Sequence, residues 1–120
     1  MHTQLRDVLE SYCYLRPERG YTQGMSYVAG HLLLYVAPGP AFVAFCHMLS
    51  GRFLRVFMTL NHDQMTARYT LHQIVFFQHL PELYQHFSDV GIRPEMYLME
   101  WCMTLFATKL DIDVVGRVWD

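Results

Sequence analysis

Apolar residues near the start of the chain recur at the spacing of a helix rather than in the alternation of a strand. One stripe, at the i, i+3, i+4, i+7 and i+8 positions, consists of Leu5, Val8, Leu9, Tyr12 and Cys13. We expect Thr3 to be the N-cap of this helix, because its hydroxyl can accept a hydrogen bond from a free N–H of the first turn. Arg16 should end the helix, since the residue before Pro17 is disfavoured in the helical region.

Proline and glycine residues divide the remaining apolar pattern into further helices. The predicted ranges are 25–36, 41–49, 52–59, 63–80, a segment from 81 to a left-handed cap at Gly91, 94–107, and a last helix that Asp111 caps. The range 25–36 is apolar almost all round, which is typical of a central, buried helix, and Pro38-Gly39-Pro40 separates it from the next one. The expected fold class is all-α, an array of short packed helices whose last member is unfinished at Asp120.

The composition limits the classes of function that fit the chain. Of its 120 residues, 52% are hydrophobic and 17% are charged, which excludes an intrinsically disordered chain. The charged fraction is below the average of about 25%, so we expect apolar surface to meet further polypeptide or a partner. The formal net charge of −2 argues against a nucleic-acid partner, which would require a basic surface.

A stretch without Asp, Glu, Lys or Arg extends from residue 20 to residue 51, long enough to cross a bilayer that needs about 20 residues. Polar side chains interrupt its first half, and Pro38-Gly39-Pro40 breaks its middle. We therefore expect a buried helix and no transmembrane segment. The first residues show no basic segment followed by an apolar run, so no secretory signal is expected either.

Cysteine and histidine are the residues that a metal or redox site would need. The chain contains three cysteines, Cys13, Cys46 and Cys102. They form no CxxC pair and are expected to be buried thiols in a reducing compartment. His72, His79 and His86 are seven residues apart, but Pro81 should start a new helix between the last two. We therefore predict no metal site.

The segment from residue 16 to residue 27 differs from the rest, because it is a polar loop that leads directly into a predicted helix. Gln23 lies at the junction, where Ser, Thr, Asp or Asn would cap the helix better. Gly24 permits a close backbone approach or a φ that other residues avoid. Two interpretations follow. Either Gln23 bonds the loop backbone, which the residues alone favour, or its amide positions a water by donating and accepting at once.

Tyr21-Thr22-Gln23-Gly24 resembles the YxQG motif of the TBC domain (Tre-2/Bub2/Cdc16), the catalytic module of Rab GTPase-activating proteins. Further matches follow in order along the chain. They are Gly20, Met25, Pro81-Glu82-Leu83-Tyr84, Tyr97, Trp101, Leu105-Phe106-Ala107 and Arg117-Val118-Trp119-Asp120, the last of which is similar to the RxWD signature. The resemblance covers nearly the whole chain.

This resemblance implies an activator of GTP hydrolysis by Rab-family small GTPases rather than an enzyme with its own substrate. Gln23 is then the catalytic residue, which supplies the water-positioning amide in trans. Tyr21, Gly24 and Met25 are the implied partner-binding residues, because they flank this glutamine in the motif. GTP and Mg²⁺ belong to the partner GTPase, so the chain itself needs no cofactor or metal.

The chain also departs from the family pattern. A TBC domain is longer, and the IxxDxxR motif that carries its arginine finger is not found here. Residues 1–120 are therefore expected to be the central part of the domain, without the arginine-finger segment or the C-terminal helices, and weak or inactive alone. Two alternatives remain: a GTPase-binding or scaffolding module without activating activity, and an unrelated helical interaction domain. The expected location is the cytoplasm, with peripheral recruitment to endomembranes for vesicle trafficking.

Overall fold

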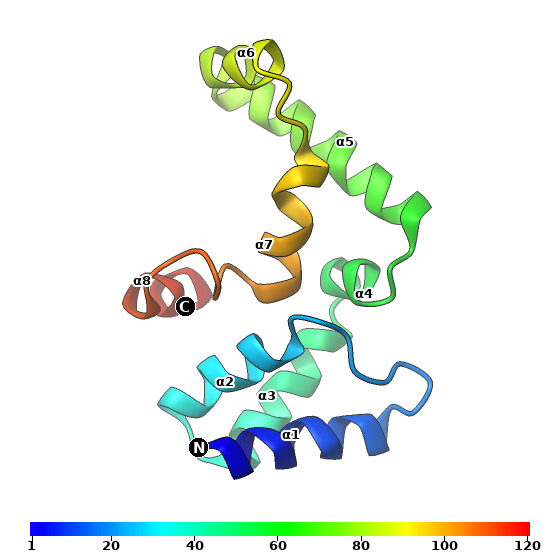
Figure 1. The fold of residues 1–120 in the computed structure, drawn as a ribbon, viewed down its shortest axis with the longest axis vertical. Helices are drawn as coiled ribbons and strands as arrows, with labels where there is room; N and C mark the ends of the chain where they lie inside the picture. The colour runs from blue at the N-terminus through cyan, green and yellow to red at the C-terminus, as the bar shows by residue number, and fades with distance from the viewer.

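Helices make up all of the regular structure in the computed structural model, which describes residues 1–120 (Figure 1). The elements are α1 (His2–Leu15), α2 (Met25–Tyr35), α3 (Pro38–Ser50), α4 (Arg52–Met58), α5 (His62–His79), α6 (Pro81–Asp89), the 3-10 turn η1 (Pro94–Met96), α7 (Leu98–Thr104) and α8 (Ile112–Trp119). The predicted all-α class and its short helices are confirmed.

Some helix ends differ from the sequence-based prediction. Helix α1 begins directly after Met1, and Thr3 lies within it instead of capping it. Helix α3 begins at Pro38, because a proline in the first turn loses no helical hydrogen bond. At the other end of the chain, Asp111 is the N-cap of α8 as predicted, although its side chain makes no capping hydrogen bond.

The single helix predicted over residues 94–107 is wrong. The chain forms η1, breaks at Tyr97, and continues as the seven-residue helix α7. Helix α7 ends because Leu105 and Phe106 both adopt left-handed conformations, with φ of 49° and 67°. Such conformations are unfavourable for non-glycine residues, so local sequence preference does not predict this end.

The core cluster extends through α4 and α7 to α5, and its first part lies where α1, α2 and α3 pack on one another. These three helices are called the bundle. Val28, Ala29 and Phe45 are fully buried there, and the ring of Tyr12 meets the ring of Phe45 edge-on at 5.2 Å between centroids. The first half of α2 is therefore as central as predicted. Its far end is not, since Leu34 remains exposed.

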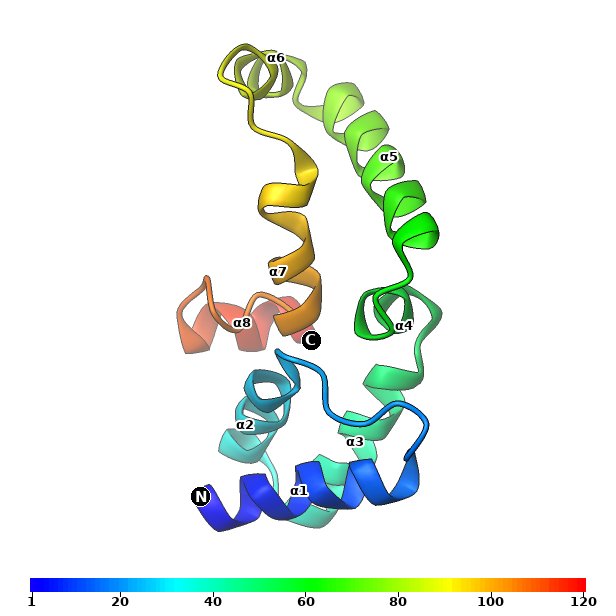
Figure 2. The same ribbon diagram turned by 45° about the vertical axis from the view of Figure 1, so that its right-hand side comes forward.

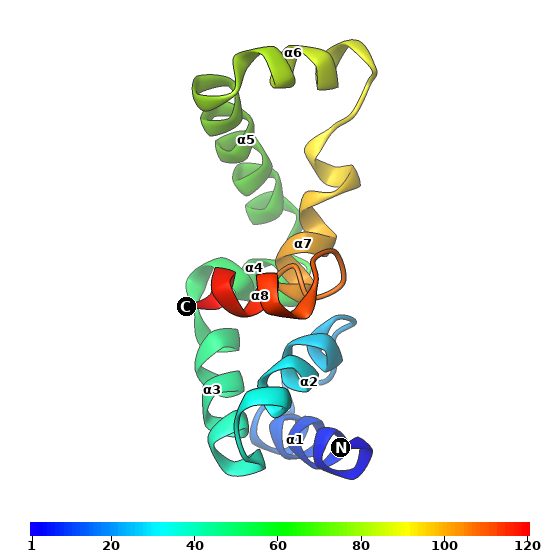
Figure 3. The same cartoon turned by 90° about the vertical axis from the view of Figure 1, so that its left-hand side faces the viewer.

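Helices α4 and α7 connect the bundle to a long projection, residues 62–96, which is called the arm and consists of α5, α6 and η1 (Figure 2). Helix α6 lies across the end of the arm and joins α5 to the segment that returns through η1 to α7 (Figure 3). The whole molecule measures 46 × 32 × 20 Å. It is thus elongated, and α7 brings the returning chain back beside the start of α2.

No single helix is both long enough and apolar enough to cross a membrane. Helices α3 and α4 pass that test of length and composition only when they are taken together, and they are bent by 86° at the break between them.

Candidate functional site

The loop after α1 turns twice before α2 begins. Gly20 takes a left-handed φ of 61°, and Gln23-Gly24 form a turn that leads into Met25, the first residue of α2. Residues 21–25 are called the corner. It contains all four of the site residues predicted from the sequence: Tyr21, Gln23, Gly24 and Met25.

Gly24 meets both conditions that the sequence suggested for it. Its φ is 104°, a conformation that residues with a side chain rarely adopt. A Cβ at this position would lie 2.9 Å from the backbone oxygen of Met103 on α7. The corner therefore packs backbone to backbone against α7, and only glycine fits without a shift.

Gln23 is exposed, and its side chain makes no hydrogen bond within the chain. The interpretation that this amide bonds the loop backbone is therefore not what the structure shows. The backbone N–H groups of Gln23, Gly24 and Ser26 also lack an acceptor in the chain. Unpaired N–H groups at the start of a helix carry partial positive charge. The corner thus offers a free amide side chain beside several free donors.

The other corner residues are held in place. Thr22 donates from its hydroxyl to the backbone oxygen of Met58 on α4, at 3.0 Å, and its N–H lies 3.3 Å from the sulfur of Met25. Tyr21 donates from its phenol to the hydroxyl of Ser26 at 3.3 Å. Sequence analysis missed Thr22, because its partner lies on a helix distant in the sequence and no local pattern marks it.

Burial divides the predicted partner-binding residues into two kinds. The side chain of Tyr21 is 54% exposed and can meet a partner directly. Met25 is only 1% exposed and belongs to the core cluster, and Gly24 is buried against α7. These last two residues can contribute to binding only indirectly, by holding the corner.

A hollow of about 300 Å³ lies beside the corner. It is lined by Gln23, Gly24 and Tyr27 on one side and by Glu95, Met96, Met99, Glu100, Met103, Thr104 and Thr108 on the other. Glu100 is fixed there, because one carboxylate oxygen accepts from Thr108 at 3.3 Å and the other lies 3.0 Å from the ammonium of Lys109. No arginine is among the lining residues. The wall opposite Gln23 is therefore acidic and rich in methionine.

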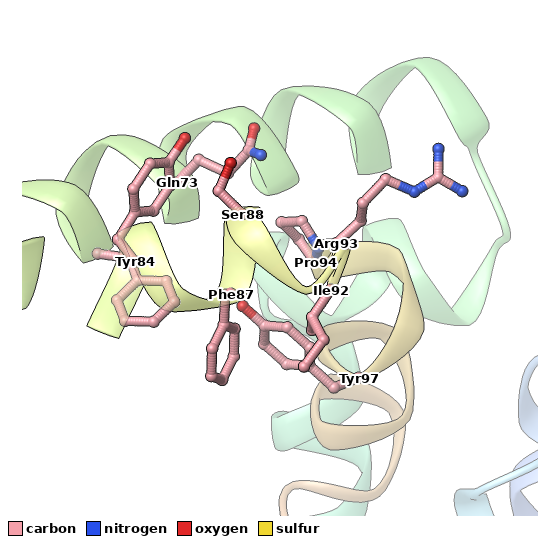
Figure 4. Close-up of a pocket in the computed structure, with 10 residues that line it drawn as sticks. Gln73, Tyr84, Phe87, Ser88, Ile92, Arg93, Pro94 and Tyr97 are labelled. Atoms are coloured by element: carbon pink, nitrogen blue, oxygen red, sulfur yellow. The ribbon is translucent and has the colours of Figure 1, made fainter. Parts of the chain in front are cut away.

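A second hollow, of about 280 Å³, lies at the arm, and its lining includes the aromatic residues Phe76, Tyr84, Phe87 and Tyr97 (Figure 4). Phe87 and Tyr97 approach edge-on at 5.9 Å between centroids, and Figure 4 shows Arg93 extending away from Tyr84. Burial lowers the pKa of His72, whose Nε2 lies 2.8 Å from the phenol oxygen of Tyr97. These contacts join α5 and α6 to Tyr97, the residue that precedes α7.

The histidines and cysteines behave as separate side chains. No group of three His, Cys, Asp or Glu residues lies close enough to hold a metal ion. Cys102 is buried, and burial raises the pKa of its thiol to about 11. Cys13 and Cys46 are half-buried, less than predicted, and all three cysteines are free.

The segment similar to RxWD serves to attach α8. The indole N–H of Trp119 donates to the backbone oxygen of Leu105 at 2.8 Å, and its ring packs edge-on against His31 at 4.4 Å. Arg117 and Asp120 are exposed. Trp119 thus fastens the last helix to the left-handed turn that ends α7.

Comparisons with known proteins agree over the whole chain. The family model described as Rab-GTPase-TBC domain matches residues 1–120. TBC1 domain family member 12 of Xenopus tropicalis and TBC1 domain family member 14 of Homo sapiens are each 34% identical over 119 residues, 99% of this chain. Drainin of Dictyostelium discoideum is 30% identical over 120 residues, all of this chain. The chain spans 17% of the length of the first two relatives and 27% of Drainin.

Proposed function

This chain belongs to the Rab-GTPase-TBC domain family, and on that premise we propose that it acts in a GTPase-activating protein for Rab-family small GTPases. In this proposal residues 1–120 are the central part of the domain. The site of action is the cytoplasmic face of endomembranes, to which the protein is recruited peripherally. The reaction is the GTPase's own, and GTP and Mg²⁺ are bound by the partner.

The proposed mechanism assigns the water-positioning step to Gln23. In GTP hydrolysis a glutamine orients the attacking water toward the γ-phosphate, and an arginine stabilises the charge that develops on the transferred group. A carboxamide suits the first role, because its oxygen accepts a hydrogen bond from the water while its NH₂ donates to another acceptor. The observation that carries this proposal is the exposure of Gln23 without any internal hydrogen bond, on a corner where Thr22 bonds α4 and Gly24 packs against α7.

The other corner residues have supporting roles in this proposal. Tyr21 contacts the GTPase directly, because its ring is exposed beside Gln23. Gly24 keeps the corner close to α7, and Met25 anchors the start of α2 in the core. Neither a metal ion nor a cofactor of the chain's own takes part.

The arginine that completes the mechanism is proposed to come from another part of the polypeptide. The hollow beside Gln23 has no arginine in its lining, and an arginine finger contributes roughly 10³-fold to 10⁵-fold to turnover. We therefore expect the 120-residue chain alone to stimulate hydrolysis weakly or not at all.

The test is single-turnover GTP hydrolysis by a panel of Rab GTPases, with the chain in its full natural polypeptide. We expect Gln23→Ala to lower the stimulated rate by at least about 10²-fold, as is typical when a reacting group is misplaced. The matched control is Gln4→Ala, since Gln4 is also exposed and makes no side-chain hydrogen bond but lies at the start of α1.

Three outcomes would separate the alternatives. Stimulation that survives Gln23→Ala would contradict the proposed role of this amide. Binding to GTP-loaded Rab without any stimulation by the unaltered protein would indicate a GTPase-binding or scaffolding module. Failure to bind any member of the panel would favour a helical interaction domain with another partner.

A further inference from the structure

The corner is tied to the rest of the molecule by one long-range hydrogen bond. The hydroxyl of Thr22 donates to the backbone oxygen of Met58, the last residue of α4, at 3.0 Å. Every other hydrogen bond made by residues 16–24 stays within the loop, α1 or α2. Thr22 is therefore the only polar link between the loop and an element outside the bundle.

The acceptor of this bond depends on Thr22. Met58 lies in the last turn of α4, where backbone oxygens have no partner within the helix. No backbone N–H donates to the Met58 oxygen, whereas the oxygens of Val56 and Phe57 do receive N–H groups of the following turn. Met58 is also a buried residue, and without the Thr22 hydroxyl no group of the chain would donate to its oxygen.

Thr22 and Gly24 flank Gln23 and are fixed in different ways. Gly24 rests on the backbone of Met103 through van der Waals contact, which limits how near α7 the corner can lie. The bond from Thr22 to Met58 is directional, so it limits how the chain is rotated where it enters Gln23. Gln23 itself makes no internal contact of this kind. The backbone position from which the Gln23 side chain projects is therefore set by its neighbours, and Thr22 supplies the one directional bond.

We propose that Thr22 is the positioning residue for Gln23, and that its hydroxyl sets the rate of the stimulated hydrolysis without contributing to the affinity for the GTPase. This inference rests on the function proposed above. Thr22 is half-buried within the corner, so the proposed role does not require it to touch the partner. A displacement of about 1 Å in a reacting group can cost about 10²-fold in rate, which makes a single hydrogen bond sufficient for a measurable effect.

The principal variant is Thr22→Val, which keeps the shape of the side chain and removes only the donor. In the full natural polypeptide we expect the single-turnover kcat to fall by about 10-fold or more, while KM for the GTPase stays within about twofold. Thr22→Ser should restore kcat to within about threefold of the unaltered protein, since it keeps the hydroxyl.

Thr59→Val is the matched control. The hydroxyl of Thr59 also donates to a backbone oxygen of α4, that of Arg55 at 2.8 Å, but this bond stays inside the helix end and does not reach the loop. We expect this variant to leave both kcat and KM unchanged. A fall in kcat as large as that of Thr22→Val would overturn the proposal, because it would attribute the effect to α4 rather than to the corner.

A double variant tests whether Thr22 acts through Gln23. If it does, Thr22→Val combined with Gln23→Ala should be no slower than Gln23→Ala alone. If the rate losses of the two single substitutions instead multiply in the double variant, the positioning role is overturned. The proposed mechanism and the proposed role of Thr22 can fail separately. Full activity of Gln23→Ala would contradict the mechanism. Loss of activity in Gln23→Ala together with full activity in Thr22→Val would contradict only the role of Thr22.

Thr22→Cys provides a second test of the proposal if Thr22→Val does not fold. A thiol is a much weaker hydrogen-bond donor than a hydroxyl, although it is similar in size. We expect kcat to be higher for Thr22→Ser than for Thr22→Cys. The thermal midpoints and KM values of the two variants should be alike. Equal kcat for these two variants would overturn the proposal.

Discussion

Some residues of the corner are held by contacts with other helices, whereas the side chain of Gln23 makes no hydrogen bond within the chain. Gly24 packs so closely on α7 that a Cβ there would lie 2.9 Å from a backbone oxygen, and Thr22 bonds the end of α4. Gln23 between them is exposed and unbonded. Because Gly24 and Thr22 already hold the backbone on both sides of Gln23, binding a partner has to order mainly the Gln23 side chain rather than the loop.

Gly24→Ala tests the rigidity of the corner. We expect it to lower the free energy of unfolding by about 2 kcal/mol or more, since the new Cβ combines a left-handed φ with a backbone clash. Gly30→Ala is the control, because Gly30 lies inside α2 with open space around it and should raise stability by up to about 1 kcal/mol. Urea unfolding of the domain in its full natural polypeptide measures both changes. Equal stability of Gly24→Ala and the unaltered protein would contradict the close approach.

The candidate site was only partly predictable from the sequence. Gln23 and Gly24 stand out, because neither suits an ordinary helix start and both match a short motif. The contacts that hold them are made with Met58 and Met103, which lie far along the chain. No periodicity or turn chemistry encodes such pairings, so Thr22 could not be recognised as the residue that ties the corner to α4.

Among the helices, those with a clear apolar stripe or a flanking proline were predicted well. The prediction failed at α7, where Leu105 and Phe106 end the helix in conformations that their local preferences oppose. The indole N–H of Trp119 bonds the oxygen of Leu105 at 2.8 Å and helps to stabilise this turn. This bond opposes local preference, and it can form only once α8 has packed.

The attachment of α5 to Tyr97 predicts a dependence of stability on pH. Burial lowers the pKa of His72, and the bond between its Nε2 and the Tyr97 phenol suits a neutral ring. The unfolded chain, in which histidine has a pKa of about 6.5, then binds protons before the folded one does. Stability should therefore be fully present above about pH 6.5 and fall as the pH is lowered toward the folded pKa.

Urea unfolding of the domain in its full natural polypeptide at pH 7.5 and pH 5.5 measures this effect. We expect His72→Gln to reduce the loss of stability between the two pH values, and His79→Gln, at an exposed position on the same helix, to leave it unchanged. Burial also lowers the pKa of His31, so part of the loss should remain. The same pH dependence in His72→Gln as in the unaltered protein would contradict the assignment.

The molecule as a whole is extended for its length. Its radius of gyration is 15.9 Å, whereas a compact chain of this size has about 13–14 Å, and only 22 of its 120 residues are buried. Large apolar side chains are exposed on the arm and on α8. They are Leu71, Ile74, Val75, Phe77, Leu80, Leu83, Val90, Ile92, Met96, Ile112, Val114 and Val118. The shortage of charged residues in the sequence thus corresponds to apolar surface, as expected.

This exposure predicts that the 120-residue chain is poorly cooperative when it is isolated. A two-state domain of its size unfolds with an enthalpy of about 80 kcal/mol at its midpoint. We expect a van't Hoff enthalpy well below that value from circular dichroism, together with strong binding of a hydrophobic dye to the folded chain. A sharp transition at the full enthalpy without dye binding would contradict the prediction.

The contact between Gly24 and Met103 also fixes when the corner can be completed during synthesis. Helices α1, α2 and α3 emerge from the ribosome early and can pack on one another, but the surface that supports Gly24 belongs to α7 and is translated much later. A nascent chain that stops before α7 therefore lacks the surface on which Gly24 packs. Cellular quality control that acts on partly made chains would therefore encounter α1, α2 and α3 before the candidate site is complete.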